Sequence, residues 1–409
     1  MAELVIMPKE DYQNICNSVR SKTGGTALLK SGEVAEQIMS ISAGGGGGST
    51  ASVPWNDVTF IDYDGTVLHS YTLEEAQALT ELPPLPEQPG LICQGWNWSL
   101  EDIKAQGKVI VGAMYITDDG KTRIYITLHE GRTSPMLGVC PNGTVTVDWG
   151  DGTEPDVLTG NNTTVVKWTP THEYAKPGDY VISMIVDGTM WFYGTTNNSY
   201  TLTHSQSTDN RNKAYSSSVN KIEIGDGVTG IYNYAFQNCY NLTSVVIPNS
   251  VTIMYKTAFC NCYSLTSVAT PGSVSESVFQ NCYNLTSVVI PIKAKSIGTN
   301  AFRSCRTLAS VVIPNSVTSI GGSAFYECYN LTSVVIPNSV TSIGGSAFYN
   351  CHGVRYYDFS ACTSVPTLEG TSAFTGIAAD CQILIPSALY DEWSTATNWA
   401  TYASYMVAV

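Results

Sequence analysis

The sequence predicts a mainly β, multidomain protein whose C-terminal half is a repeat solenoid, and three observations carry this prediction. Phenylalanines preceded by Ala or Val recur at spacings of 23, 20, 23, 23, 23 and 26 residues, at Phe236, Phe259, Phe279, Phe302, Phe325, Phe348 and Phe374. Cysteines keep the same period, at Cys239, Cys262, Cys282, Cys305, Cys328 and Cys351. Charged residues are only 13% of the chain, which favours β-structure with uncharged surfaces over a helical enzyme. A fixed period in this range indicates one supersecondary unit stacked on copies of itself.

Composition divides the chain into seven segments. Two short helices are predicted near residues 10–21 and 31–41, and Gly44 to Gly48 mark a flexible linker behind them. The segments, in order, are a helical docking segment, a Gly-rich linker, a first β module, a second β module, a polar connector, the repeat solenoid and a C-terminal helical cap: 1–43, 44–54, 55–116, 117–190, 191–218, 219–353 and 354–409.

The repeat unit has two nearly identical adjacent copies, Leu308–Asn330 and Leu331–Gly353. Its L-x-x-V-x-I run predicts a strand with the first, fourth and sixth residues inward, and the proline that follows ends it. The third unit is three residues short around Ser273–Ser277, where we expect the coil to flatten or bulge. The motif resembles the BspA-like leucine-rich repeat, which implies an open solenoid that presents a long surface.

The first β module contains VTFIDYDGTVL, which predicts a hairpin turning at Asp64-Gly65, and then Thr72, which predicts a helix cap. These residues and the later Gly95-Trp96 resemble the Listeria–Bacteroides repeat. That resemblance implies a small β-grasp module over residues 55–116.

The second β module begins with a predicted hairpin at Asp118-Asp119-Gly120 and continues with Trp149-Gly150-Asp151-Gly152-Thr153, followed by His172-Glu173-Tyr174. This pattern resembles the polycystic kidney disease (PKD) domain, which implies an immunoglobulin-like β-sandwich. Asp148 and Asp151 could bind calcium. Alternatively they bond the backbone of their own turn, since short acidic side chains do this in tight turns.

Both ends of a solenoid need covers, because exposed strand edges template aggregation. At the N-terminal end we expect Val219–Ile231 and the preceding connector to form the cover. At the C-terminal end a helix starting at Ser387, with Trp393, Trp399 and Tyr402, is expected to do so. The two tryptophans could instead be ligand platforms.

Two stripes of the solenoid are candidate binding surfaces. Outward-facing strand residues form a Ser/Val stripe: Ser244, Val246, Ser267, Ser287, Val289, Ser310, Val312, Ser333 and Val335. A second stripe follows the cysteines, with two neighbours added where the repeat pattern departs: Tyr240, Tyr263, Tyr283, Arg306, Tyr329 and His352, with Tyr255 and Lys256. Tyrosines beside Asn241, Asn284 and Asn330 suit stacked sugar rings, and Tyr and Arg are also enriched at protein hot spots. They could also simply cover the coil corners.

Several classes of function are disfavoured. A net charge of −14 argues against nucleic acid. We find no signal peptide, membrane span, metal motif, phosphate loop or nucleophile elbow, and so expect neither an enzyme nor a cofactor. The repeat cysteines are expected to be reduced core thiols.

The resulting prediction is a phage tail or fibre protein. In this interpretation residues 1–43 attach to tail or baseplate proteins of the virion, and the solenoid binds a glycan or protein of the bacterial host surface. The alternatives are an exported bacterial surface adhesin and a purely structural tail component. Assembly as a homo-oligomer is left open.

Overall fold

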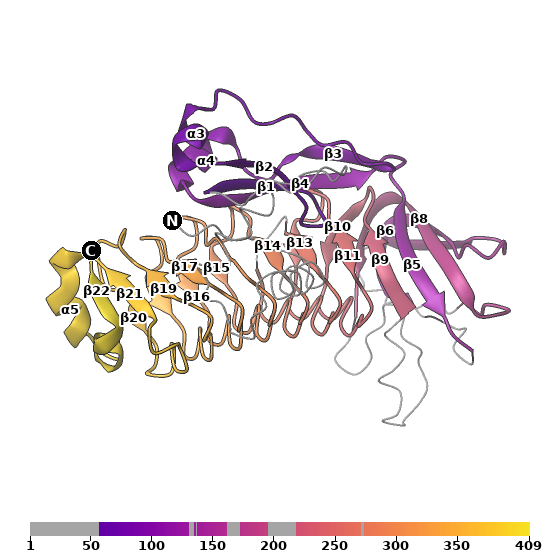
Figure 1. Cartoon of the computed structure of the whole chain (residues 1–409). Helices are drawn as coiled ribbons and strands as arrows, with labels where there is room; N and C mark the ends of the chain where they lie inside the picture. The colour runs from indigo at the N-terminus through magenta and orange to yellow at the C-terminus, as the bar shows by residue number, and fades with distance from the viewer. Residues whose placement is uncertain (1–56, 131–134, 136, 162–171, 195–217, 271–273) are drawn as a thin grey trace, which may run out of the picture.

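The computed structural model describes residues 57–130, 135, 137–161, 172–194, 218–270 and 274–409. A small β module lies along one side of a long coil array, a block of long strands closes one end of that array, and helices close the other (Figure 1). The predicted helices of residues 1–43, the linker 44–54 and most of the connector lie outside the described residues.

The small β module is a mixed four-stranded sheet in the order β2-β1-β4-β3. Its strands are β1 (Val58–Ile61), β2 (Val67–Tyr71), β3 (Leu91–Trp96) and β4 (Val109–Thr117), with helices α3 (Leu73–Ala78) and α4 (Leu100–Gln106). The hairpin predicted at Asp64-Gly65 joins β1 to β2, and Gly65 takes a φ of +89°, which favours glycine. Thr72 caps α3 in a reciprocal capping box with Glu75, as predicted.

The strand block contains β5 (Thr122–Leu128), β6 (Val139–Asp148), β7 (Asp156–Asn161) and the long β8 (Gly178–Phe192). The first half of β8 pairs with β5 and its second half with β6. The hairpin predicted at Asp118–Gly120 is wrong, because β4 and β5 belong to different sheets. The turn instead carries the chain from the small module into the strand block.

The strand block continues directly into the array. Strand β9 (Val219–Glu223) pairs antiparallel with β5, and β10 (Val228–Ile231) pairs parallel with β8. Residues 219–231 are therefore the first coil rather than its cover, which corrects the sequence prediction. The cover is the strand block, whose β5 and β8 satisfy the hydrogen bonds of that first coil.

Most coils of the array contribute one strand to each of two faces, and residues 308–313 and the short third unit are the exceptions. One face carries β11 (Ser244–Val246), β13 (Ser267–Ala269), β14 (Ser287–Val289), β17 (Ser333–Val335), β19 (Tyr356–Asp358), β21 (Gln382–Ile385) and β22 (Met406–Ala408). The second face carries β12 (Ile253–Met254), β15 (Ser296–Ile297), β16 (Ser319–Ile320), β18 (Ser342–Ile343) and β20 (Thr367–Leu368). We call the first of these the strand face.

Stacked phenylalanines run through the centre of the array. Centroids of successive rings from Phe236 to Phe374 lie 5.3 to 5.8 Å apart, with nearly parallel planes. The cysteine thiols lie in the same core, and those from Cys262 to Cys351 in the repeat series donate to the carbonyl of a phenylalanine in the previous coil, as Cys305 does to Phe279 at 3.3 Å. Burial raises the pKa of Cys239 and Cys351 to about 12 and that of the four thiols between them well above its usual value. These thiols are poor nucleophiles because the thiolate is the reactive form.

The short third unit interrupts the sheet of the second face, and the strand face is broken after β14, because residues 308–313 form no strand. Strands β13 and β14 pair with each other in a separate two-stranded sheet, and Val274 and Ile297 form an isolated bridge on the second face. The predicted irregularity is therefore a local loss of strand pairing, while the Phe259, Phe279 and Phe302 stack continues across it.

The small module packs on the strand face across this interruption. Val289 packs with Ile61 and Ile110, and Val246 packs with Ala113 and Tyr115. The Ser267 hydroxyl donates to the Tyr63 carbonyl at 2.8 Å.

Two glutamines of the module hold the Pro-Asn turns at either end of this contact. The side-chain oxygen of Gln94 accepts from the backbone N–H of Asn249 at 3.0 Å, and that of Gln106 accepts from the N–H of Asn315 at 2.8 Å.

The predicted Ser/Val stripe is therefore largely covered. Val246, Ser267, Ser287 and Val289 are each at most 3% exposed, because the module lies over them. Beyond the module Val335 is 40% exposed. Sequence alternation predicted the outward direction of these side chains and had no means of showing what lies on them.

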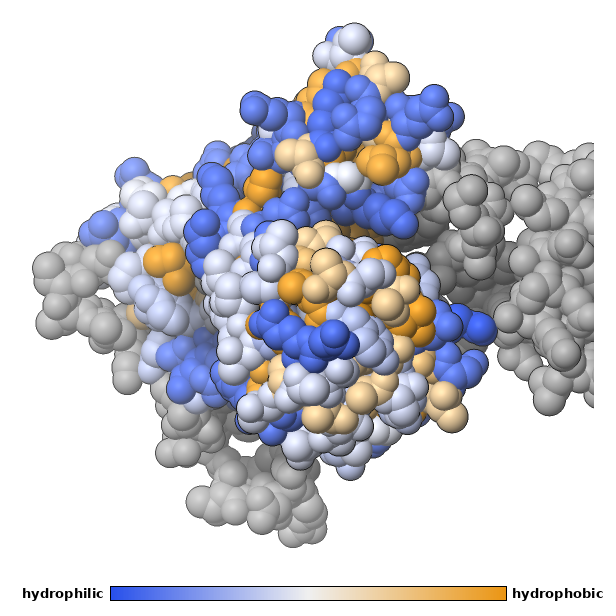
Figure 2. Space-filling view, turned by 90° about the vertical axis from the view of Figure 1, so that its left-hand side faces the viewer, coloured by the Kyte–Doolittle hydropathy of each residue, from blue (hydrophilic) through white to orange (hydrophobic). Residues whose placement is uncertain are grey.

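The C-terminal end is closed by η3 (Ser387–Leu389), α5 (Tyr390–Thr395), η4 (Trp399–Tyr405) and β22. Trp393, Trp399 and Tyr402 are buried against Phe359 and Phe374, so the tryptophans cap the core and do not offer ligand platforms. Figure 2 looks onto this end, where small apolar patches are interspersed with hydrophilic surface and surface of intermediate hydropathy.

Candidate binding surface

A tight turn around each buried phenylalanine forms the outer ridge of the array. From Phe236 to Phe348, two residues per turn take a left-handed φ of 54–65°, two positions before and two positions after the phenylalanine. Asparagine or serine occupies most of these positions, since their short polar side chains tolerate this conformation. We define the outer ridge as the residues one, two and four positions after each phenylalanine.

The row four positions after phenylalanine, here called the tyrosine row, is a continuous stack. Its members are Tyr240, Tyr263, Tyr283, Arg306, Tyr329 and His352. The ring centroids of Tyr240 and Tyr263 lie 4.7 Å apart, as do those of Tyr263 and Tyr283. The ring centroids of Tyr329 and His352 are also 4.7 Å apart. The Arg306 guanidinium carbon lies 4.8 Å from the Tyr283 centroid and 5.7 Å from that of Tyr329.

This stacking changes which ligands the row can accept. The planes of neighbouring rings differ by only 17–21°. Both faces of each inner ring are therefore in contact with a neighbouring ring or with the Arg306 guanidinium. A sugar that stacks flat on tyrosine needs a free face, and the hypothesis of sugar rings stacked along the row is therefore disfavoured. What the row offers outward is ring edges, hydroxyls and the edge of the Arg306 guanidinium.

The middle row of the ridge links coils through side-chain amides. The Asn261 amide donates to Asn238 at 2.6 Å, and that of Asn281 donates to Asn261 at 2.8 Å. Ser304 and Glu327 occupy the next two positions, and the Ser304 hydroxyl donates to the Glu327 carboxylate at 3.2 Å. The middle row thus changes from amides to a charged group halfway along the array.

The sequence prediction missed the row directly after phenylalanine. Its members are Gln237, Cys260, Gln280, Arg303, Tyr326 and Tyr349. The Arg303 guanidinium carbon lies 4.2 Å from the Tyr326 centroid, and Tyr326 stacks on Tyr349 at 4.8 Å. The repeat alignment contains a signal for this row, since Tyr326 and Tyr349 recur directly after Phe325 and Phe348.

Tyr255 and Lys256 do not belong to the tyrosine row, which corrects their grouping with it. Tyr255 packs on Tyr232 with centroids 4.4 Å apart, and Tyr232 stacks on Trp191 of β8 at 4.5 Å. Both residues follow β12 on the second face, before the phenylalanine turn. The remaining six predicted residues are brought together as one surface.

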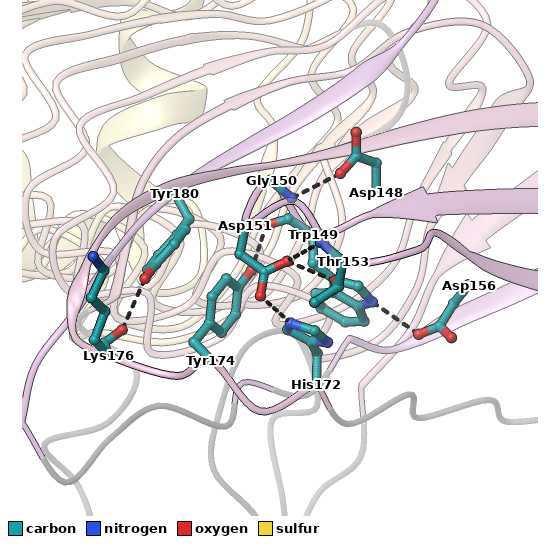
Figure 3. A network of polar contacts seen from close by, with 10 residues as sticks. All are labelled: Asp148, Trp149, Gly150, Asp151, Thr153, Asp156, His172, Tyr174, Lys176 and Tyr180. Carbon is teal, nitrogen blue, oxygen red and sulfur yellow. Dashed lines mark hydrogen bonds and ion pairs between the residues drawn. The ribbon is translucent and has the colours of Figure 1, made fainter.

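The Asp148–Thr153 turn uses its carboxylates internally (Figure 3). Asp148 accepts from the Gly150 N–H at 2.9 Å, and Asp151 accepts from the Thr153 hydroxyl at 2.7 Å and contacts His172 Nε2 at 2.7 Å. Trp149 is buried and stacks on His172. Within the described residues no group of three or more His, Cys, Asp or Glu side chains is placed to hold a metal ion.

We predict that Asp151→Asn destabilises the strand block by about 1–2 kcal/mol at pH 7. Burial disfavours the Asp151 carboxylate, but bonds from Thr153 and His172 outweigh this and lower its pKa to about 2. A lowered folded-state pKa gives stability that is present above about pH 4 and lost as pH falls towards 2. Urea unfolding of both chains should therefore show a difference that shrinks between pH 4 and pH 2. A difference that stays constant over this range would contradict the role given to the charged carboxylate.

The described part of the chain shows no helix long and apolar enough to cross a membrane. His69, His129, His172 and His352 lie in separate parts of the structure, and Cys351, next to His352, is fully buried. The predicted absence of a catalytic site remains a prediction.

A family model for the BspA type leucine rich repeat region matches the chain in six copies, over residues 188–302 and 272–387. The array is therefore built from BspA-type leucine-rich repeats. No curated protein matches the chain. The resemblances of the small module and the strand block to the Listeria–Bacteroides repeat and the PKD domain have no counterpart in these comparisons.

Among solved structures, similar chains include the leucine-rich-repeat protein TpLRR of T. pallidum, with 22% identity over 40% of this chain and 79% of the other, at a TM-score of 0.23. A leucine rich cell surface protein of Faecalibacterium prausnitzii A2-165 has 26% identity over 41% and 67%, at a TM-score of 0.23. A leucine-rich-repeat protein of Bacteroides ovatus has 21% identity over 41% and 55%, at a TM-score of 0.28. The assignment of the repeats rests on the family match and the coil geometry.

Proposed function

We propose that this chain, built around BspA-type repeats, is a non-enzymatic adhesin of the bacterial-surface kind whose tyrosine row binds a protein on another surface. The observation that carries this proposal is the continuous stack from Tyr240 to His352. Stacked side chains are already ordered before binding, so less conformational entropy is lost when a partner docks on them. Tyr and Arg are also the residue types enriched at protein hot spots.

A protein partner is favoured over a glycan because the inner ring faces are occupied. Ring edges, hydroxyls and a guanidinium edge suit backbone carbonyls and acidic side chains of a protein. The strand face is a weaker candidate, since the small module covers it from Val246 to Val289. The tail or virion assignment, with attachment through residues 1–43, finds no support in the comparisons and falls outside the described residues.

The test is binding of the full chain to a panel of bacterial and epithelial cells. The triple variant Tyr240→Phe, Tyr263→Phe, Tyr283→Phe removes three hydroxyls and keeps the rings stacked, so the fold should be preserved. We expect it to bind at least tenfold more weakly, as for loss of hot-spot hydrogen bonds. The matched control is Tyr356→Phe with Tyr390→Phe, two residues that are 36% and 37% exposed outside the row.

Equal loss in the control, or full binding by the triple variant, would contradict the proposal. A wild-type chain that binds none of the cells would favour a structural role without a receptor.

A further inference from the structure

One coil breaks the pattern of the outer ridge in two rows at once. Arg303 stands where neighbouring coils carry Gln280 or Tyr326, and Arg306 stands where they carry Tyr283 and Tyr329. The two arginines flank Ser304, which takes a left-handed φ of 58° within the turn. Both positive charges are thus presented by one turn of the ridge.

Stacking fixes both guanidinium groups. Arg303 lies over Tyr326 at 4.2 Å, and Arg306 lies between Tyr283 and Tyr329 at 4.8 and 5.7 Å. Cation–π contacts of this kind contribute about 0.5–1 kcal/mol at exposed sites and hold the planar group in place. Because the flat faces of the guanidinium groups lie on tyrosine rings, their N–H edges remain for hydrogen bonds. The geometry of these N–H groups matches the oxygens of a carboxylate or a phosphate.

The local anions do not neutralise these groups. Within the described residues Arg303 makes no ion pair, and Arg306 has a single long one with Glu327, at 3.7 Å. Both partners of that pair are partly exposed, at 49% and 23%, and exposed pairs of this kind contribute little. Glu327 also accepts from Ser304, which keeps it beside the two arginines.

Glu327 is itself an exception. It takes a φ of 58°, at a position that is asparagine in most coils, and a left-handed conformation is unfavourable for glutamate. A strained residue beside a charge cluster points to a functional position rather than a packing need.

The surrounding charge supports an anionic ligand despite the acidic chain. Residues 276–327 carry four basic side chains, Lys293, Lys295, Arg303 and Arg306, and two acidic ones, Glu276 and Glu327. At physiological salt, charges beyond about 8 Å are largely screened, so the net charge of −14 does not decide binding at this turn.

We propose that Arg303 and Arg306 form an anion-binding site at the centre of the outer ridge, which takes a carboxylate or phosphate group of the partner. The site rests on the proposed function in that it would anchor the same partner. Tyr283, Tyr326 and Tyr329 form its walls, and Glu327 moderates its affinity and selects against weakly placed anions.

The experiment measures binding of the full chain to three immobilised polymers in 0.15 M salt: poly-L-glutamate for carboxylate, polyphosphate for phosphate, and uncharged dextran. We expect binding to one or both anionic polymers and none to dextran. The better of the two identifies which acid the site takes. Binding to neither overturns the anion site while the cell-binding test of the tyrosine row still decides the proposed function.

Variants separate this site from general charge attraction. Arg303→Gln with Arg306→Gln should weaken polymer binding about tenfold. Lys293→Gln with Lys295→Gln removes the same charge from exposed residues of the same coil on another face and should leave binding unchanged. If both double variants weakened polymer binding equally, the effect would come from net charge alone, and the proposed site would be overturned.

Glu327→Gln gives a test that misfolding cannot mimic, because a gain is expected. Removing the carboxylate beside Arg306 should raise affinity for the anionic polymer about threefold, as expected for loss of one weak competing ion pair. Unchanged or lower affinity would show that Arg306 does not contact the polymer.

Discussion

Replacing Phe302 with alanine is expected to lower the free energy of unfolding by about 3–5 kcal/mol. The ring is fully buried, stacks on Phe279 at 5.8 Å and on Phe325 at 5.4 Å, and its carbonyl accepts from the Cys328 thiol at 3.2 Å. The cavity would therefore weaken two coil interfaces at once. In a solenoid each coil contacts only its neighbours, so the damage should concentrate at this point.

Urea denaturation measures the total loss, and amide hydrogen exchange locates it. Exchange should accelerate most between Phe279 and Phe325 and least in the small module. Tyr356→Ala is the control, since this side chain is exposed and its loss should stay within about 0.5 kcal/mol. Equal losses for the two variants would show that the stacked phenylalanines do not hold the array together.

Substituting Gly112 with leucine should detach the small module from the strand face. A Cβ atom at this position would lie 3.1 Å from Val289 Cγ2 and 3.5 Å from the Ala269 Cβ, so a longer side chain has no room. The backbone of Gly112 is already held by Asn97 and by β1, and the module should keep its own fold. Overpacking of this kind costs about 1–3 kcal/mol, which is comparable with the stability of a small interface.

The measurement is hydrogen exchange of β13 and β14, together with solution scattering for the position of the module. Exchange of these strands should accelerate and the molecule should become more extended. The matched control is Gly345→Leu, where a Cβ would meet nothing within 4 Å. A Gly112→Leu chain with unchanged exchange and shape would contradict the close docking of the module.

The sequence predicted the array well because its determinants are local and repeated. Phe and Cys recur at the buried positions of every coil, and alternation in L-x-x-V-x-I marks inward residues without knowledge of any partner. The same holds for Thr72 and Gly65, whose roles depend on residues a few positions away. Trp393 and Trp399 were also predictable as a cap, since the repeat pattern fades just before them.

Contacts between distant segments escaped prediction. The local sequence around Ser267 and Val289 does not indicate which distant residues cover them. In the structure, Ser267 contacts Tyr63 and Val289 packs against Ile110. The hairpin expected at Asp118–Gly120 failed for the same reason, since β5 finds better partners in β8 and β9. The tyrosine row was identified by residue, whereas the loss of free ring faces follows from the coil spacing that brings each ring onto the next.

The claim that the outer ridge contacts the partner is tested most directly by tyrosine-specific chemical labelling of the wild-type chain, free and bound to cells that it recognises. Binding should protect Tyr263, Tyr283 and Tyr329 while Tyr356 and Tyr390, both exposed elsewhere, remain reactive. Protection of Tyr356 and Tyr390 with an unchanged ridge would contradict the account and place the contact on the uncovered strand face or the cap.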